Sequence, residues 1–312
     1  MRCSIHPTEL LRLVLEPAAF IRWARYALPN LRTVTHPKER IITSFLTRFL
    51  IALTFSVVSI LLPLAAIAET SNIKIGIVLM HGKGGAPTKY VSGLASSLEA
   101  QGFLVANLEM PWSGRRDYDV NVGAAEKEID SALGSLRDKG AQKLFVAGHS
   151  QGGLFALYFG TKHVVDGVIA IAPGGNVGNP TFREKLGEFV ELARKLFAEG
   201  KADEKAKLAD YEGAKGTYPI TTTPSVYLTW FDPEGAMNQT TAIRSMNPAI
   251  PVLFIAPAND YPGLLKIKQQ MFDALPKNPH SKLYEPNSNH VNAPSASIKE
   301  IVEWITAVAR TQ

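Results

Sequence analysis

Apolar and polar positions divide residues 73–175 into short apolar runs and longer amphipathic segments. The short runs are rich in β-branched residues and are bounded by Gly, Pro or polar residues, which is typical of strands buried on both faces. We predict such strands over 73–80, 103–108, 143–147 and 168–172. The segments between them carry apolar residues at helical spacing and predict helices over 88–100, 122–137 and 152–159. Strands that alternate with helices predict a parallel sheet with helices on both faces.

This alternation stops over residues 176–249 and resumes after them. The segment contains a helical stripe from Phe182 to Phe197, a polar stretch over 200–216 and no apolar run typical of a buried strand. We predict that it is a helical lid or cap, inserted over one end of the sheet. The first pattern then returns, with strands predicted over 251–256 and 282–284 and helices over 264–275 and 297–309. The expected fold class is α/β, with a mostly parallel sheet of about six strands.

An apolar segment precedes this domain. Residues 49–68 carry no charge, follow Arg48 and end in Ala66-Ile67-Ala68 before the chain turns polar. A basic flank, an apolar stretch and a small-x-small end are the parts of a secretory signal peptide, so we expect cleavage after Ala68 and export to the periplasm or the medium. The alternative is a membrane anchor, because about 20 apolar residues also span a bilayer.

Residues 1–45 are rich in Arg and poor in acidic residues. This composition is typical of an organelle-targeting segment, and it also fits a start site placed too far upstream; we favour translation from near Leu46. In both cases residues 1–68 are an N-terminal extension with a signal peptide. The remaining 244 residues (312 − 68), 69–312, are of ordinary size for one α/β domain.

Charge and cysteine content exclude several classes of function for this domain. The net charge of the chain is +5, but residues 1–68 hold 8 of the 33 Lys and Arg and 3 of the 28 Asp and Glu. The domain therefore carries 25 residues of each sign, and nucleic-acid binding loses its main support. The single cysteine, Cys3, lies in the extension, so residues 69–312 contain no disulfide, no Cys-ligated zinc and no Cys nucleophile. No histidine has a carboxylate or second histidine at ligand spacing, and we predict neither a metal nor a cofactor.

Gly148-His-Ser150-Gln-Gly152 is a G-x-S-x-G motif placed between a predicted buried strand and a predicted helix. That context is the one a nucleophile elbow requires, since the serine sits on a sharp strand-to-helix turn. Gly148 and Gly152 leave room for the strand and helix backbones to approach each other there. We predict that Ser150 is a nucleophile; a glycine-rich turn without catalytic function is the alternative.

A serine nucleophile needs a base, and the base needs an orienting acid. Of the five histidines in the domain, His290 follows the last predicted strand, and ligands meet an open α/β sheet at the carboxyl ends of its strands. Asp260 follows strand 251–256 and completes the order Ser, Asp, His. It fits this place better than Asp232, which lies in the insertion, or Glu285, which ends the last strand. The alternatives are a surface histidine and a turn aspartate.

The glycine-rich loop His81-Gly-Lys83-Gly-Gly follows the first predicted strand. Attack of a serine on a carbonyl creates an oxyanion that needs preset N–H donors. We expect these donors to be the backbone N–H of Gln151, the residue after the nucleophile, and that of Lys83. The loop is not a Walker P-loop, because G-x-x-x-x-G-K-[ST] is absent.

Together, the HGKGG loop, the GHSQGG elbow, PVLFIAPAND and the late NHVN resemble the α/β-hydrolase superfamily in kind and order, over about residues 73–175 and 250–310. The resemblance implies a hydrolase with Ser150 as nucleophile, His290 as base and Asp260 as acid. Residues 176–249 sit where that superfamily commonly carries a lid or cap. Members often have two further strands before the first one seen here, so a trimmed sheet is expected.

We therefore expect an exported serine hydrolase that cleaves a small carboxylic ester through an acyl-enzyme. Trp112, Trp230 and Phe231 are candidates for an apolar substrate pocket, although packing of the insertion onto the sheet explains its apolar stripe at least as well. A thioesterase or amidase of the same fold is one alternative. A non-catalytic binding protein that keeps the fold is the other. No nucleic-acid partner is expected, and a membrane is a partner only if residues 49–68 are uncleaved.

Overall fold

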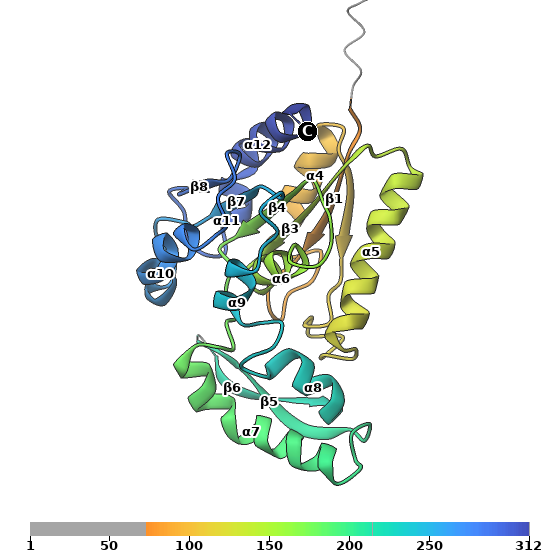
Figure 1. The fold of residues 1–312 in the computed structure, drawn as a ribbon, viewed down its shortest axis with the longest axis vertical. Coiled ribbons are helices and arrows are strands. Elements are labelled where there is room, and N and C mark those ends of the chain that lie inside the picture. The colour runs from red at the N-terminus through yellow and green to blue at the C-terminus, as the bar shows by residue number, and fades with distance from the viewer. Residues whose placement is uncertain (1–72, 214, 312) are drawn as a thin grey trace, which may run out of the picture. The chain divides into compact units, whose positions relative to one another are not determined.

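A computed structural model of the chain describes residues 73–213 and 215–311 (Figure 1). The predicted extension, with Cys3 and the apolar segment 49–68, lies outside the described residues. Among those described, no helix combines the length and the apolar character needed to cross a bilayer.

A six-stranded parallel sheet forms the centre of the fold, in the order β2-β1-β3-β4-β7-β8. Its strands are β1 (Ile75–Met80), β2 (Leu104–Leu108), β3 (Lys143–His149), β4 (Gly167–Ile171), β7 (Val252–Ile255) and β8 (Lys282–Tyr284). All six lie within or next to the apolar runs that predicted them. The predicted α/β fold with about six parallel strands is confirmed.

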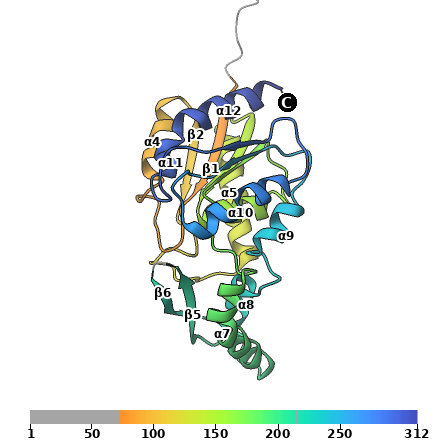
Figure 2. The same cartoon turned by 90° about the vertical axis from the view of Figure 1, so that its left-hand side faces the viewer.

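Helices cover both faces of this sheet (Figures 1 and 2). Successive residues of a strand point to opposite faces. Along β1, Ile77 and Leu79 pack with one buried cluster, and Val78 and Met80 pack with the other. The first cluster is closed by α4 (Ser92–Ala100), α11 (Ala293–Ala296) and α12 (Ile298–Thr311). The second is closed by α5 (Val122–Asp138), α6 (Gln151–Phe159) and α10 (Pro262–Asp273).

Residues 176–249, between β4 and β7, form a cap segment beside the carboxyl ends of the strands (Figure 1). Its helices are α7 (Pro180–Ala198), α8 (Pro224–Phe231) and α9 (Gln239–Arg244). Between α7 and α8 lies an antiparallel hairpin of β5 (Ala206–Glu212) and β6 (Gly216–Thr222). The prediction of a purely helical insertion is therefore wrong over these strands.

The reason for this error is visible in the packing of β5. Its apolar residues are few, but Leu208 and Ala209 are buried against α7 and α8. The next residue, Asp210, is fully buried as well. A buried aspartate breaks the apolar run by which a buried strand is recognised. Tertiary contacts, rather than local hydrophobicity, define this hairpin.

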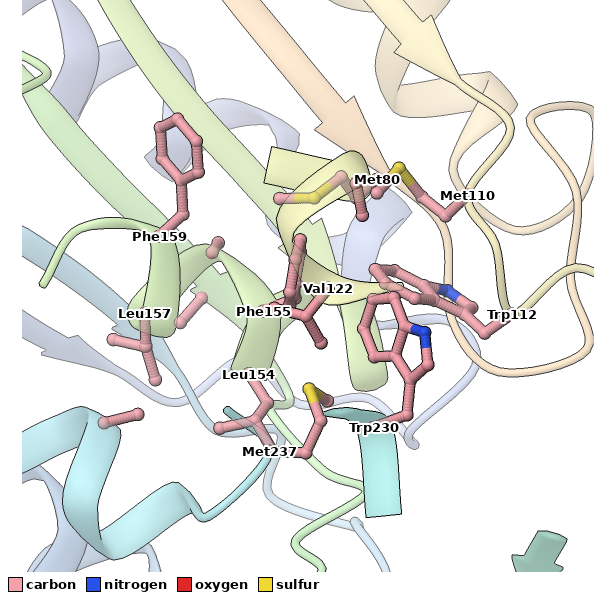
Figure 3. Packing of buried hydrophobic residues seen from close by; sticks show 14 of the residues in the cluster. Met80, Met110, Trp112, Val122, Leu154, Phe155, Leu157, Phe159, Trp230 and Met237 are labelled. Atoms are coloured by element: carbon pink, nitrogen blue, oxygen red, sulfur yellow. The ribbon is translucent and has the colours of Figure 1, made fainter. Parts of the chain in front are cut away.

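The three predicted pocket residues lie in the hydrophobic core instead. Figure 3 shows Trp112 and Trp230 there. Trp112, Trp230 and Phe231 are at most 3% exposed. The two indole rings meet edge to face, with centroids 5.7 Å apart, and both pack on Phe155 of α6. Each indole N–H donates to a backbone carbonyl, that of Trp112 to His81 and that of Trp230 to Val120. These side chains join the cap segment to the sheet, and the prediction that they line a substrate pocket is wrong.

Candidate active site

Ser150 stands on the turn between β3 and α6, with φ 55° and ψ −117°. Left-handed backbone is costly for a residue with a side chain, and such strain is found at functional sites. The turn is held by hydrogen bonds from Ser150 N–H to the Ile171 carbonyl, 2.8 Å, and from Gly174 N–H to the Ser150 carbonyl, 3.1 Å.

Both motif glycines are required by close backbone contacts. A Cβ at Gly148 would lie 2.1 Å from the carbonyl oxygen of Gly152, and one at Gly152 would lie 2.7 Å from the carbonyl oxygen of His81. No side chain fits at either position without moving backbone. The predicted steric reason for these two glycines is thus present in the structure.

Asp260 and His290 lie on the loops that follow β7 and β8. Parallel pairing continues from these strands into the loops, through a bridge between Asn259 and Asn289. The Asn259 N–H donates to the Ser288 carbonyl over 3.0 Å. Because the two loops are hydrogen-bonded to each other, the relative position of the carboxylate and the imidazole is set by the sheet.

The three predicted residues Ser150, His290 and Asp260 are brought together in one hydrogen-bonded chain. His290 Nδ1 lies 2.7 Å from Asp260 Oδ1, and His290 Nε2 lies 3.0 Å from Ser150 Oγ. An imidazole that donates from Nδ1 to the carboxylate leaves Nε2 unprotonated, ready to accept the serine proton. Asp260 and His290 are each 8% exposed, and the Tyr261 N–H donates to Asp260 Oδ1.

Two further histidines flank this chain and are held neutral. Burial lowers the pKa of His149 to about 4, and its Nε2 donates to the backbone carbonyl of His290 over 2.9 Å. Burial also lowers the pKa of His81, whose Nε2 accepts from the Met110 N–H while Nδ1 donates to the Gly82 carbonyl. His81 therefore joins two loops, and both of its ring nitrogens are engaged with the backbone.

The two predicted oxyanion donors lie on neighbouring turns: Gln151 follows Ser150, and a Cβ at Gly82, the residue before Lys83, would lie 3.1 Å from the Cβ of Ser150. Gln151 opens α6, where the first N–H groups of a helix have no partner within it. Lys83 lies in the turn after β1, which is held by the bond from Gly84 N–H to the Trp112 carbonyl, 2.9 Å. No backbone carbonyl in the described ranges accepts a hydrogen bond from the N–H of Gln151 or Lys83. Both N–H groups are thus available to a substrate oxygen.

Sequence reasoning missed a buried ion pair behind these donors. Lys83 Nζ lies 2.5 Å from Asp210 Oδ1, and the two side chains are 9% and 0% exposed. Asp210 also accepts from the hydroxyl groups of Tyr118 and Tyr218. Burial and the nearby carboxylate raise the pKa of Tyr118 well above its usual range, so this phenol stays protonated and donates. The only sequence signal was one aspartate inside the alternating stretch KLADYE.

A pocket opens beside Asp260, on the side of α10. Its lining is mainly apolar and includes Pro173, Leu264, Ile267 and Met271. The lining of this pocket does not include Trp112, Trp230 or Phe231, the residues predicted to form a substrate pocket. Among the described residues, no group of three or more His, Cys, Asp or Glu is placed to hold a metal ion.

One family model matches part of this chain. The model of the family described as "Serine aminopeptidase, S33" matches residues 71–212, which include the HGKGG loop and the Ser150 elbow. None of the curated proteins matches the chain.

Several solved structures share its fold. A monoacylglycerol lipase from Paleococcus ferrophilus is 22% identical with a TM-score of 0.53, over 75% of this chain and 94% of its own. Est1E from Butyrivibrio proteoclasticus, solved with ferulic acid bound, is 14% identical with a TM-score of 0.52, over 78% and 93%. The α/β hydrolase GrgF from Penicillium sp. sh18 is 14% identical with a TM-score of 0.56, over 76% and 90%. The sheet, the elbow motif and these matches agree, and the chain is a hydrolase of the α/β-hydrolase superfamily.

Proposed function

We propose that this protein is a serine esterase that hydrolyses small carboxylic esters through an acyl-enzyme on Ser150. The observation that carries the proposal is the chain of contacts from Ser150 Oγ to His290 Nε2, 3.0 Å, and from His290 Nδ1 to Asp260, 2.7 Å. A serine, a base and an orienting acid at these distances form the machinery of nucleophilic acyl transfer.

In the first step, Ser150 Oγ attacks the ester carbonyl while His290 Nε2 takes the serine proton. Asp260 stabilises the imidazolium that forms, and the N–H groups of Gln151 and Lys83 bind the oxyanion. Collapse of the intermediate breaks the ester bond, and His290 protonates the departing alkoxide. Water, deprotonated by His290, then attacks the acyl-serine; the bond from the acyl carbon to Ser150 Oγ breaks, His290 returns the proton to Oγ, and the carboxylic acid is released.

We choose esters as the proposed substrate class because of two solved structures that are similar to this chain. One is a monoacylglycerol lipase, and another was solved with ferulic acid, a carboxylic acid, in place. Amide or thioester cleavage uses the same serine chemistry, and the family description names an aminopeptidase.

The proposal is tested with a fluorophosphonate, which phosphonylates activated serines, followed by peptide mapping of the folded protein. We expect one adduct, on Ser150, that is lost in Ser150→Ala and in His290→Ala. His280→Ala is the matched control, because it removes a partly buried histidine outside the site. An unlabelled wild-type protein that is folded by circular dichroism contradicts the proposal and supports a non-catalytic binding role.

The leaving group is then identified with p-nitrophenyl acetate, an acyl thioester and an amino-acid p-nitroanilide. We expect the highest kcat/KM for the oxygen ester. A higher kcat/KM for the thioester or the anilide, measured on the same labelled protein, contradicts the ester assignment but leaves the serine mechanism intact.

We also propose that residues 49–68 direct export, since they combine a basic flank, an apolar stretch and Ala66-Ile67-Ala68. Expression of the full chain followed by N-terminal sequencing tests this. A new N-terminus at Glu69 in the exported fraction supports cleavage, and an uncleaved chain in the membrane supports an anchor. An uncleaved chain in the cytosol contradicts both.

A further inference from the structure

Asp210 belongs to the cap segment, yet its carboxylate is the centre of a hydrogen-bond network that reaches Lys83, in the turn after β1, and Gln151, at the start of α6. Oδ1 accepts from Lys83 Nζ at 2.5 Å and from the N–H of Tyr211 at 2.6 Å. Oδ2 accepts from the hydroxyls of Tyr118 at 2.8 Å and Tyr218 at 2.9 Å. Four donors satisfy a carboxylate that is fully buried, which is the condition under which a buried charge is tolerated.

One branch of this network ends at Lys83. Its ammonium also donates to the Tyr211 carbonyl over 3.0 Å and lies 5.2 Å from the ring centroid of Phe182. The side chain of Lys83 is thus enclosed by the cap segment, while its backbone N–H belongs to the turn after β1. Fixing this side chain restricts the peptide that carries the N–H.

The other branch ends at Gln151. Its Nε2 donates to the Tyr118 hydroxyl over 3.2 Å, and that hydroxyl in turn donates to Asp210. Tyr118 has φ 56°, a backbone conformation unusual for a side-chain-bearing residue. The cap segment holds it there, because the hydroxyl of Thr222 donates to the Tyr118 carbonyl over 2.7 Å.

The two residues held by these branches are the two whose N–H groups we propose as donors to the substrate oxygen. We infer that Asp210 is a positioning residue, through which the cap segment holds Lys83 and Gln151 in the geometry of the oxyanion hole. This inference rests on the proposed function. Asp210 itself does not reach the reacting atoms; it acts through the two donor residues.

The physical reason for such a device lies in the demands of the transition state. Donors assist only when they already point to the position where charge develops, and a small displacement weakens them. Lys83 lies in a loop that lacks the support of a helix or strand. A salt bridge in a water-excluded interior is less screened than one on the surface, so it is suited to holding this loop.

The test compares ester hydrolysis by the wild type with that of two network variants. Lys83→Met/Asp210→Asn removes both charges at once, so no unpaired ion is left in the interior, and it keeps the backbone N–H of Lys83. Tyr118→Phe removes only the hydroxyl shared by Asp210 and Gln151. Removing an oxyanion donor costs about 10²-fold or more in kcat, and we expect the double variant to lose about 10- to 100-fold because its donors are displaced rather than deleted.

We expect KM to stay within about threefold of the wild-type value, since the loss concerns an interaction made in the transition state. The rate of Ser150 phosphonylation should fall in parallel with kcat, because the phosphonyl oxygen uses the same donors. Tyr227→Phe is the matched control: it removes a buried cap hydroxyl that donates to the Ala209 carbonyl, next to Asp210, and leaves the network intact. This control should lose stability without losing kcat.

If a network variant is folded and its kcat equals that of the wild type, the positioning role is overturned. The proposed function still stands in that case, because the wild-type protein is active. A parallel loss of kcat in Tyr227→Phe also overturns it, since any cap damage would then have the same effect. A wild-type protein that is neither labelled nor active overturns the proposed function itself, and the positioning role with it.

Discussion

His149 donates its Nε2–H to the backbone carbonyl of His290 over 2.9 Å, so the residue before the proposed nucleophile holds the loop that carries the proposed base. The two rings also pack, with centroids 5.0 Å apart. We predict that His149→Ala lowers kcat by about tenfold, because a misplaced base weakens proton transfer. His149→Gln keeps an N–H donor and should retain more activity. Steady-state kinetics on a p-nitrophenyl ester distinguishes the two, and equal losses would contradict the role of the hydrogen bond.

Burial of His149 also makes stability depend on pH. Its pKa is about 4 in the folded protein against 6.5 for an unperturbed histidine, so the unfolded chain binds more protons between these values. Stability therefore falls as pH drops from 6.5 to 4, by about 3 kcal/mol from this residue. His81, whose pKa burial also lowers, contributes with the same sign. Urea unfolding at pH 7 and pH 4.5 measures the loss, which should be smaller in His149→Gln; an unchanged pH dependence would count against this assignment.

Asp260→Asn tests the proposed role of Asp260 as the orienting acid. The amide cannot hold the imidazole with Nδ1 protonated, so we expect kcat to fall by about 10⁴-fold, as the same change does in a Ser-His-Asp triad. Asp232→Asn is the control, since that carboxylate pairs with Arg194 in the cap segment, away from His290. A wild-type kcat for Asp260→Asn, or a comparable loss for Asp232→Asn, would refute the assignment.

Local sequence predicts those parts of the fold in which the burial and the backbone conformation that each residue type favours are the ones it has in the structure. The strands of the sheet are apolar along their whole length because helices cover both faces, and glycines stand where backbones nearly touch at Gly148 and Gly152. The order of Ser150, Asp260 and His290 could be predicted for the same reason, since each follows a recognisable strand.

What sequence could not predict depends on contacts between distant segments. Asp210 looks like a surface residue, and only its burial among Lys83 and two tyrosines reveals its place. Trp112 and Trp230 are 118 positions apart (230 − 112) and pack together only because the cap segment folds back on α6. An apolar side chain in a sequence does not indicate whether it faces a substrate or another part of the protein.

The elbow glycines lead to a prediction about folding. Gly148→Ala places a Cβ 2.1 Å from the Gly152 carbonyl oxygen, so β3 and α6 must move apart. We expect loss of both stability and Ser150 labelling. Gly134→Ala is the control: it lies within α5, where a Cβ meets nothing within 4 Å, and it should stabilise the protein by up to about 1 kcal/mol. Thermal unfolding of the two variants decides the matter, and a Gly148→Ala protein as stable as the wild type would contradict the close contact.

Trp230 separates a core role from a substrate-binding role. It is 1% exposed, packs on Trp112 and Phe155, and donates its indole N–H to the Val120 carbonyl over 2.8 Å. Truncation to Ala should lower the free energy of unfolding by about 3–5 kcal/mol, as for other large core side chains. Trp230→Phe keeps most of the packing and loses one hydrogen bond, so it should remain folded with a loss of about 1–2 kcal/mol.

The substrate affinity of Trp230→Phe then decides between the roles. A core residue leaves KM unchanged, whereas a pocket residue raises KM for apolar esters and leaves that for acetate esters nearly the same. Phe197→Ala on α7 is the control for a cap aromatic outside the core, because this ring is 52% exposed, and it should change neither stability nor KM. A chain-length-dependent rise of KM in Trp230→Phe would return this residue to the substrate pocket, since a side chain confined to the core has no means of sensing the length of an acyl group.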